Sequence, residues 1–166
     1  MIPISDINPA RNTPVISRIF MFVTVVVFIL IQPKNQFELF NFFYQYSAIP
    51  CELVKFSPIS EGQFYNNNCF YTQTNSIFPN KNIILSMVFA NFFHANFIHI
   101  LGNLWSFWIF GNNVEDKLGK SKFTIFLIFI GIISIGVHTF LNQESLTPIV
   151  GASGIVSGLM GAYVFM

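Results

Sequence analysis

The stretch GASGIVSGLMGAY, residues 151–163, opens an apolar run and carries two signals. Small residues recur in it at every fourth position, a spacing that lets helices pack closely in membranes. These residues are Gly154, Gly158 and Ala162. Packing alone does not explain Gly151 and the tight Gly-x-Ser-Gly step that it starts. A serine at a helix start, here Ser153, lies near free N–H groups of the first turn, which can help to stabilise a developing oxyanion. The stretch therefore predicts a close-packing helix with a candidate nucleophile at its head.

The composition around this stretch is that of a membrane protein. Of the 166 residues, 53% are hydrophobic and 9% are charged, whereas soluble domains carry about 25% charged residues. The mean hydropathy is +0.59. A net charge of +1 gives no indication of a nucleic-acid partner. The polar N-terminus, MIPISDINPARNTPVISR, does not read as a cleavable signal peptide. We therefore expect an integral membrane protein.

Four apolar stretches are long enough, or nearly so, to cross a bilayer as helices, which takes about 20 residues. The expected helices lie at residues 15–31, 83–110, 123–141 and 148–166. Residues 32–82 form an expected outer loop. The sequence thus predicts one all-α polytopic membrane domain over residues 1–166.

The expected outer loop has three features. Its segment FELFNFFYQY suits either an interfacial position, because aromatic rings favour the headgroup level, or an ordinary surface helix. Its segment SPISEGQFYNNNCFYTQTNS is predicted to be irregular. Cys51 and Cys69 both lie in this loop, where a disulfide is permitted. Without geometry the pairing stays open, and two free cysteines are the slightly favoured expectation.

Basic residues predict the orientation, because loops rich in Lys and Arg stay in the cytoplasm. The short loop expected at residues 111–122 contains three lysines: Lys117, Lys120 and Lys122. Arg11 and Arg18 place the N-terminus on the same, cytoplasmic side. The helix at 148–166 then starts from the outer side.

Polar side chains interrupt the second apolar stretch at HANFIHILGN, residues 94–103. His99 and Asn103 are four residues apart and share a helix face. They suit either an interhelical hydrogen bond or a pair of donors directed at one oxyanion. His94 is five residues before His99, roughly 140° around a regular helix, and is expected to point elsewhere. That spacing, without nearby Cys, Asp or Glu, argues against a metal site. His138, in the third stretch, has no polar partner on its face and is expected to be a buried packing residue.

Three motifs in this order make the chain resemble the rhomboid family of intramembrane serine proteases. The first is the spacing of His94, His99 and Asn103. The second is GNNVEDKLG at residues 111–119, and the third is the Gly-x-Ser-Gly step at residues 151–154. The resemblance extends from roughly residue 86 to residue 166, and it implies an incomplete rhomboid-like bundle with about four transmembrane helices.

The resemblance implies a role for each of these residues. Ser153 would be the nucleophile, and His99 and Asn103, with the Ser153 backbone N–H, would stabilise the oxyanion. Structural residues around the site would be His94, Gly151, Gly154 and Glu115. The substrates would be transmembrane segments of other membrane proteins, and neither a metal nor an organic cofactor would be needed. The expected location is a bacterial inner membrane.

The general base is the main departure from the family pattern. Rhomboid proteases take this base from a histidine on a later helix, and no such helix follows Ser153 within these residues. Ser157 stands where the family often has an aromatic ring against the base. A serine hydroxyl is a weak nucleophile without a base. We therefore expect the amino-terminal part of an active enzyme. The alternatives are an inactive rhomboid-like protein that binds membrane clients, and a small transporter or channel subunit.

Overall fold

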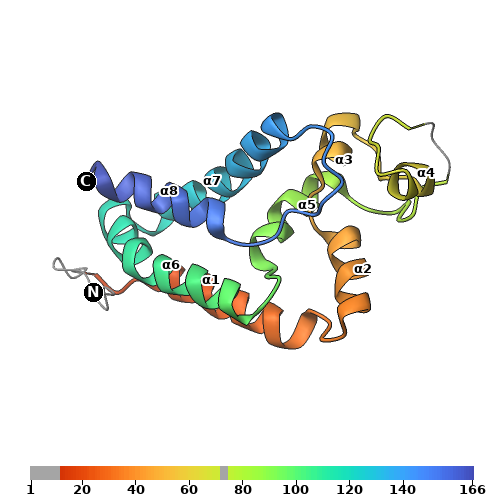
Figure 1. Ribbon diagram of the computed structural model, residues 1–166. Helices are drawn as coiled ribbons and strands as arrows, with labels where there is room; N and C mark the ends of the chain where they lie inside the picture. The colour runs from red at the N-terminus through yellow and green to blue at the C-terminus, as the bar shows by residue number, and fades with distance from the viewer. Residues whose placement is uncertain (1–11, 72–74) are drawn as a thin grey trace.

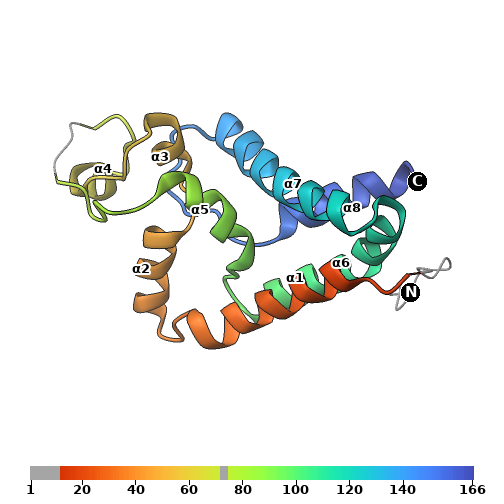
Figure 2. The ribbon, with the colours of Figure 1, turned by 180° about the vertical axis from the view of Figure 1, so that it is seen from behind.

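The computed structural model describes residues 12–71 and 75–166, so Arg11 lies outside the described residues. The regular elements of the described part are helices, and its strand pairing is limited to two isolated bridges, Ala48 with Ile149 and Ser60 with Ser76. The expectation of an all-α chain is confirmed. Figures 1 and 2 show α1 beside α6 on one side of the molecule and α7 on the other. The helix α8 packs against both α6 and α7.

The helix α1 (Val15–Val26) packs against α6 (Phe97–Leu118). It continues into the π-helix η1 (Val27–Ile31). Pro14, at the N-cap of α1, provides no side-chain cap. Glu115 of α6 caps this helix instead. Its carboxylate accepts hydrogen bonds from the Ile16 N–H (2.9 Å), the Ser17 N–H (2.8 Å) and the Ser17 hydroxyl (2.7 Å). The carboxylate therefore satisfies donors that a helix start leaves free and complements the helix dipole.

The connection between α6 and α7 (Lys120–Leu141) is a single residue, Gly119. The expected loop at residues 111–122 is therefore wrong, because α6 continues through most of it. Gly119 has a φ of +75°, a positive value that glycine adopts without strain and that other residues rarely adopt.

The expected continuous helix at residues 83–110 is also wrong. α5 (Ile83–Phe89) and the 3₁₀ turn η2 (Ala90–Phe92) meet α6 at an angle of 83°. Asn96 starts α6 afresh, because its side chain accepts a hydrogen bond from the His99 N–H at 2.9 Å. An N-cap of this kind begins a helix even inside an apolar run.

Among the described helices, α7 is the one that is long and apolar enough to cross a membrane by itself. The bent pair of α5–η2 with α6 qualifies as a second, broken span. The segment Val15–Ile31 and α8 (Ser153–Val164) are shorter apolar helices. α8 begins five residues later than the expected start at residue 148.

The expected outer loop at residues 32–82 contains three helices, α2 (Gln36–Tyr46), α3 (Pro50–Lys55) and α4 (Glu61–Tyr65). α4 falls within the segment predicted to be irregular. Ser60 and Gln63 explain this helix, because they form a capping box at its start. We call residues 36–71 and 75–82 the α2–α4 region.

A disulfide joins Cys51 of α3 to Cys69, with the two Cα atoms 5.7 Å apart. The expectation of two free cysteines is wrong. The turn after α4 brings Cys69 back to α3, where the Gln63 amide donates a hydrogen bond to the Cys69 carbonyl at 2.6 Å. Residue spacing alone does not reveal this return.

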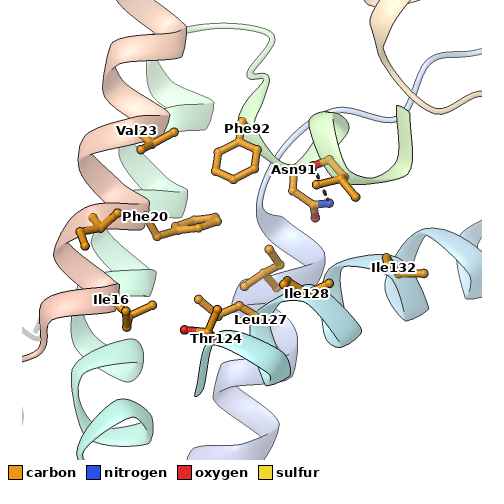
Figure 3. Close-up of a pocket in the computed structure, with 12 residues that line it drawn as sticks. Ile16, Phe20, Val23, Asn91, Phe92, Thr124, Leu127, Ile128 and Ile132 are labelled. Carbon is orange, nitrogen blue, oxygen red and sulfur yellow. Dashed lines mark hydrogen bonds between the residues drawn. The ribbon is translucent and has the colours of Figure 1, made fainter. Parts of the chain in front are cut away.

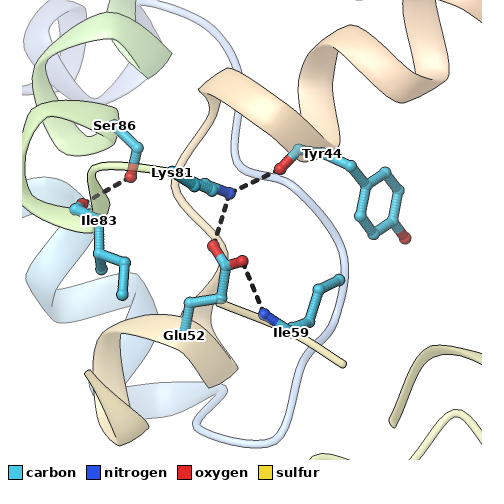
Figure 4. A network of polar contacts seen from close by, with 6 residues as sticks. All are labelled: Tyr44, Glu52, Ile59, Lys81, Ile83 and Ser86. Carbon is cyan, nitrogen blue, oxygen red and sulfur yellow. Dashed lines mark hydrogen bonds and ion pairs between the residues drawn. The ribbon is translucent and has the colours of Figure 1, made fainter. Parts of the chain in front are cut away.

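A buried ion pair joins Lys81 to Glu52, the residue that follows Cys51 in the chain (Figure 4). The Lys81 ammonium contacts Glu52 Oε2 at 2.5 Å and donates to the Tyr44 carbonyl at 2.7 Å. Glu52 Oε1 accepts a hydrogen bond from the Ile59 N–H at 3.0 Å. Both charged side chains are 1% exposed. Burial raises the pKa of Glu52 and lowers the pKa of Lys81, and the attraction between the two charges partly opposes both shifts.

Candidate functional site

The connection into α8 turns sharply at Gly151, which has a φ of +110° and is buried. A Cβ atom at this position would lie 2.7 Å from His99 Cε1 and Nε2 and 3.3 Å from Asn103 Nδ2. The Gly151 N–H donates to the Ala90 carbonyl at 2.9 Å. Both the backbone conformation and the close approach of His99 therefore require glycine here.

The structure thus brings the predicted residues His99 and Asn103 together with the Gly-x-Ser-Gly step. Asn103 is 8% exposed, and its Nδ2 has no hydrogen-bond partner among the described residues. A buried donor without a partner costs free energy unless a ligand satisfies it. Asn103 therefore provides an unpaired N–H donor beside Gly151.

Ser153 is the first residue of α8, and its side chain is exposed. No hydrogen bond from Ser153 Oγ to another described residue is found. Ala152, at the N-cap, provides no side-chain cap for the N–H groups that follow it. An uncapped helix start favours negative charge. We call residues 151–153, with the His94, His99 and Asn103 side chains, the Gly151 junction.

His94 lies before α6 rather than on it, in the break at residues 93–96, so the expected angle of roughly 140° to His99 does not apply. The two imidazole rings instead meet edge to face with their centroids 5.1 Å apart. His94 Nδ1 lies 3.2 Å from the Phe92 carbonyl, and Nε2 lies 3.5 Å from the Ala152 N–H. These partners fit a neutral ring that donates from Nδ1 and accepts at Nε2.

Glu115 and His138 lie away from this junction. Glu115 is sixteen residues after His99 on the same helix, which is about 24 Å along the helix axis. Its carboxylate caps α1. His138 is in the last turn of α7 and is exposed, so the expectation of a buried packing residue is wrong. The buried residues of α7 are Phe123, Leu127, Gly131, Ile135 and Thr139, and His138 is not among them.

Two different faces of α8 use its small residues. Cβ atoms at Gly154 and Gly158 would overlap Ser134 and Ile130 of α7, so these glycines allow the two helices to pack closely. Another row is exposed: Ser153, Ser157 and Gly161. A Cβ atom on Gly161 would meet no atom within 4 Å. The helix is therefore packed on one side and open along the row that starts at Ser153.

Sequence reasoning missed Gln32, the residue after η1. Its side chain is 4% exposed and forms two hydrogen bonds with the backbone of His94. The available signal was an amide at the end of an apolar stretch. The sequence offers no spacing rule that connects this residue with His94, which is 62 positions away.

An apolar cavity of about 220 Å³ lies between α1, η2, α7 and α8 (Figure 3). Its lining is aliphatic and aromatic, with Asn91 and Thr124 as polar members. The Thr124 hydroxyl donates a hydrogen bond to the Lys120 carbonyl, and the Asn91 amide nitrogen donates one to the Met87 carbonyl. The cavity provides apolar contacts but no acid, base or nucleophile, so the Gly151 junction is the better candidate for a chemical site.

No cluster of three or more His, Cys, Asp or Glu side chains that could hold a metal ion occurs within residues 12–71 and 75–166. The functional groups at the junction are a hydroxyl, an amide, two imidazoles and backbone N–H groups. Such groups can attack a carbonyl carbon and stabilise the resulting oxyanion.

Comparison with known proteins identifies the family of the chain. The rhomboid domain profile matches residues 81–166. The chain is 38% identical over 73 residues to the putative rhomboid protease YdcA of Bacillus subtilis, covering 44% of this chain and 36% of that protein. It is 35% identical over 99 residues to the putative rhomboid protein L523 of Acanthamoeba polyphaga mimivirus, covering 57% and 56%. It is 40% identical over 76 residues to the rhomboid protease GlpG of Salmonella newport, covering 45% and 26%. The chain thus spans between 26% and 56% of the length of these relatives. No solved structure matches the chain.

Proposed function

The chain belongs to the rhomboid family of membrane proteins, and from this premise we propose that it carries the nucleophile and oxyanion site of an intramembrane serine endopeptidase. Its substrates are transmembrane segments of other membrane proteins. Its own fold is part of a bundle with about four spanning segments. The N-terminus and residues 111–122 face the cytoplasm, in a bacterial inner membrane.

One observation carries this proposal. Gly151 lies against His99 and the unpartnered Asn103 amide. Two residues after Gly151, the exposed Ser153 begins a helix whose N-cap residue provides no side-chain cap. Either feature alone would suit a packing contact. Their combination supports the proposal, because a hydroxyl nucleophile and several N–H donors are what an oxyanion site requires.

In the proposed reaction, Ser153 Oγ attacks the carbonyl carbon of the scissile peptide bond, and a histidine base takes the hydroxyl proton. The carbonyl oxygen becomes an oxyanion, which accepts hydrogen bonds from His99, Asn103 and the Ser153 N–H. The intermediate then expels the amine, which receives the proton from the base. Water attacks the acyl-enzyme with the help of the same base and restores the serine.

The three histidines of this sequence are poorly placed to act as that base. Both ring nitrogens of His94 have backbone partners, His99 is assigned to the oxyanion, and His138 is exposed at the end of α7. We therefore propose that the base histidine lies beyond these 166 residues. The exposed row that starts at Ser153 and continues to Gly161 offers a surface for the helix that carries it.

A serine-reactive fluorophosphonate probe and a transmembrane reporter substrate test the proposal, with the complete protein in liposomes. The wild-type protein should label and cleave. Ser153→Ala should do neither, with turnover lower by about 10⁴-fold or more. Ser157→Ala is the matched control, since this serine lies one turn further along the same exposed row. It should retain both activities.

A second candidate function is client binding without cleavage, which the absence of a suitably placed base among the described histidines favours. Binding of the reporter without cleavage or labelling by the wild-type protein would support it. Undiminished labelling of Ser153→Ala would contradict the nucleophile assignment. Neither binding nor cleavage, together with solute flux through the liposomes, would favour the transporter alternative.

A further inference from the structure

The end of α1 changes its helical pitch before reaching the Gly151 junction. Thr24 and Gln32 are both buried although eight residues separate them, which in a regular α-helix would place them about 80° apart. The π-helix η1 lies between them, and its Gln32 N–H donates to the Val27 carbonyl at 2.9 Å. A π turn accommodates one extra residue. The angle between the two residues around the helix axis is therefore that of about seven regular positions, roughly 20°. This small angle places Gln32 on the same buried face as Thr24.

At that position the Gln32 side chain pairs with the backbone of His94 in both directions. Its Nε2–H donates to the His94 carbonyl at 2.9 Å, and its Oε1 accepts from the His94 N–H at 2.8 Å. The break at residues 93–96 leaves the His94 peptide groups without helical partners. Buried peptide groups need partners, above all in a membrane protein. Gln32 supplies both of them.

The ring of His94, whose backbone Gln32 holds, contacts two parts of the Gly151 junction. It contacts the Ala152 N–H through Nε2 at 3.5 Å, and it meets the His99 ring edge to face. Ala152 directly precedes Ser153. The orientation of the His94 ring is therefore linked both to the start of α8 and to one proposed oxyanion donor.

We propose that Gln32 is a positioning residue for the Gly151 junction, acting through the backbone of His94 on the Ala152 peptide and the His99 ring. Gln32 touches neither the nucleophile nor the substrate. Its effect on catalysis rests on the proposed function, whereas its effect on the His94 ring does not.

Gln32→Met tests this proposal in the complete protein, because Met keeps a similar shape and loses both hydrogen bonds. Displacement of a reacting group by about 1 Å can lower turnover about 10²-fold. We expect kcat for the transmembrane reporter to fall by about 10- to 10²-fold, with KM nearly unchanged. Thr24→Val is the matched control, since Thr24 is buried on the same helix and its hydroxyl bonds only to the Phe20 carbonyl. Its kcat should stay near that of the wild type.

A double-mutant cycle separates positioning from general stability. If Gln32 acts through His94, adding Gln32→Met to His94→Ala should lower kcat little further. Full additivity of the two losses would overturn the proposal. So would a Gln32→Met variant with wild-type kcat.

A spectroscopic readout keeps the test independent of protease activity. In micelles, the ¹⁵N resonances of His94 in the wild-type protein should show a protonated Nδ1 and an unprotonated Nε2. Gln32→Met should shift or broaden both resonances, and Thr24→Val should leave them in place. Unchanged resonances in Gln32→Met would overturn the positioning role even in an active enzyme. Full cleavage by Ser153→Ala would instead contradict the proposed function and leave this readout decisive for Gln32.

Discussion

The α2–α4 region and the Gly151 junction differ in whether their buried polar groups have hydrogen-bond partners. In the α2–α4 region the Glu52 carboxylate uses both oxygens, and the Gln63 amide both donates and accepts. At the junction the buried Asn103 Nδ2 has no partner among the described residues, and the Ser153 hydroxyl is exposed. Satisfied polar groups stabilise a fold, whereas unpartnered ones cost free energy. The first region satisfies these polar groups within the fold, whereas the second leaves a buried amide donor unpartnered, as the proposed oxyanion role requires.

Ser47 refines this comparison. Its hydroxyl is buried without a partner in the described part of the chain, although it belongs to the α2–α4 region. One orphaned hydroxyl therefore does not indicate a site. The junction differs because its unpartnered amide lies beside a glycine that no other residue could replace without strain.

Among the variants that test this comparison, Gly151→Ala should have the largest combined effect on turnover and stability, because the new side chain lies inside the junction. The new Cβ would collide with the His99 ring, and a φ of +110° disfavours alanine. We expect a loss of turnover of about 10²-fold from displacement and a further loss of about 1–3 kcal/mol in stability from strain. Reporter cleavage and thermal unfolding measure both. Gly136→Ala, in open space on α7, should change neither. Equal losses in both variants would remove the special status of Gly151.

Lys81→Met should lower stability without lowering turnover. It leaves the Glu52 carboxylate buried without its cation, which typically costs about 3–5 kcal/mol of stability. Turnover per folded molecule should stay near the wild-type value, because the pair lies outside the junction. Lys55→Met is the control, since Lys55 lies over the Phe70 ring in the same region and such a contact contributes about 0.5–1 kcal/mol. A larger loss from Lys55→Met would show that the buried pair is not the main ionic support.

Asn103→Ala should lower turnover by about 10²- to 10³-fold, as expected for an oxyanion donor. Stability should change little, because its amide nitrogen has no partner to lose. Asn113→Ala on the same helix removes an amide that donates to the Ile109 carbonyl at 3.1 Å. This control should keep its turnover. Stability loss in Asn103→Ala without loss of turnover would place Asn103 with the structural polar groups instead.

The smallest expected effect is a pH dependence in the α2–α4 region. Burial raises the folded-state pKa of Glu52 above 4.5, the ordinary value. The folded state then keeps this proton in a window that begins near pH 4.5, where the unfolded chain releases it. The resulting stabilisation is full below this window and is lost as pH rises through the raised pKa. Tm should therefore fall with rising pH across it, and Glu52→Gln should remove that slope. Glu61→Gln, at an exposed site, should retain it. An unchanged slope in Glu52→Gln would contradict this assignment.

The sequence predicted the helical class because low charge and the length of apolar runs can be read directly from the linear order of residues. It failed at element boundaries where one residue overrides an apolar pattern. Asn96 caps a new helix inside the expected span, and Gly119 reduces an expected loop to one residue. It also failed for Cys51 and Cys69, because pairing depends on a return of the chain that spacing does not encode.

The sequence by itself determined the family, the membrane-protein class and the candidate residues Ser153, His99 and Asn103, because these follow from residue type and local spacing. Only the tertiary structure decided how those residues meet. The 83° bend carries His94 off α6, and the positive φ of Gly151 lets the start of α8 approach His99. The π turn returns Gln32 to the buried face, where it meets the His94 backbone. These contacts join segments separated by up to 62 positions, and local periodicity carries no information about which distant segments will pack together.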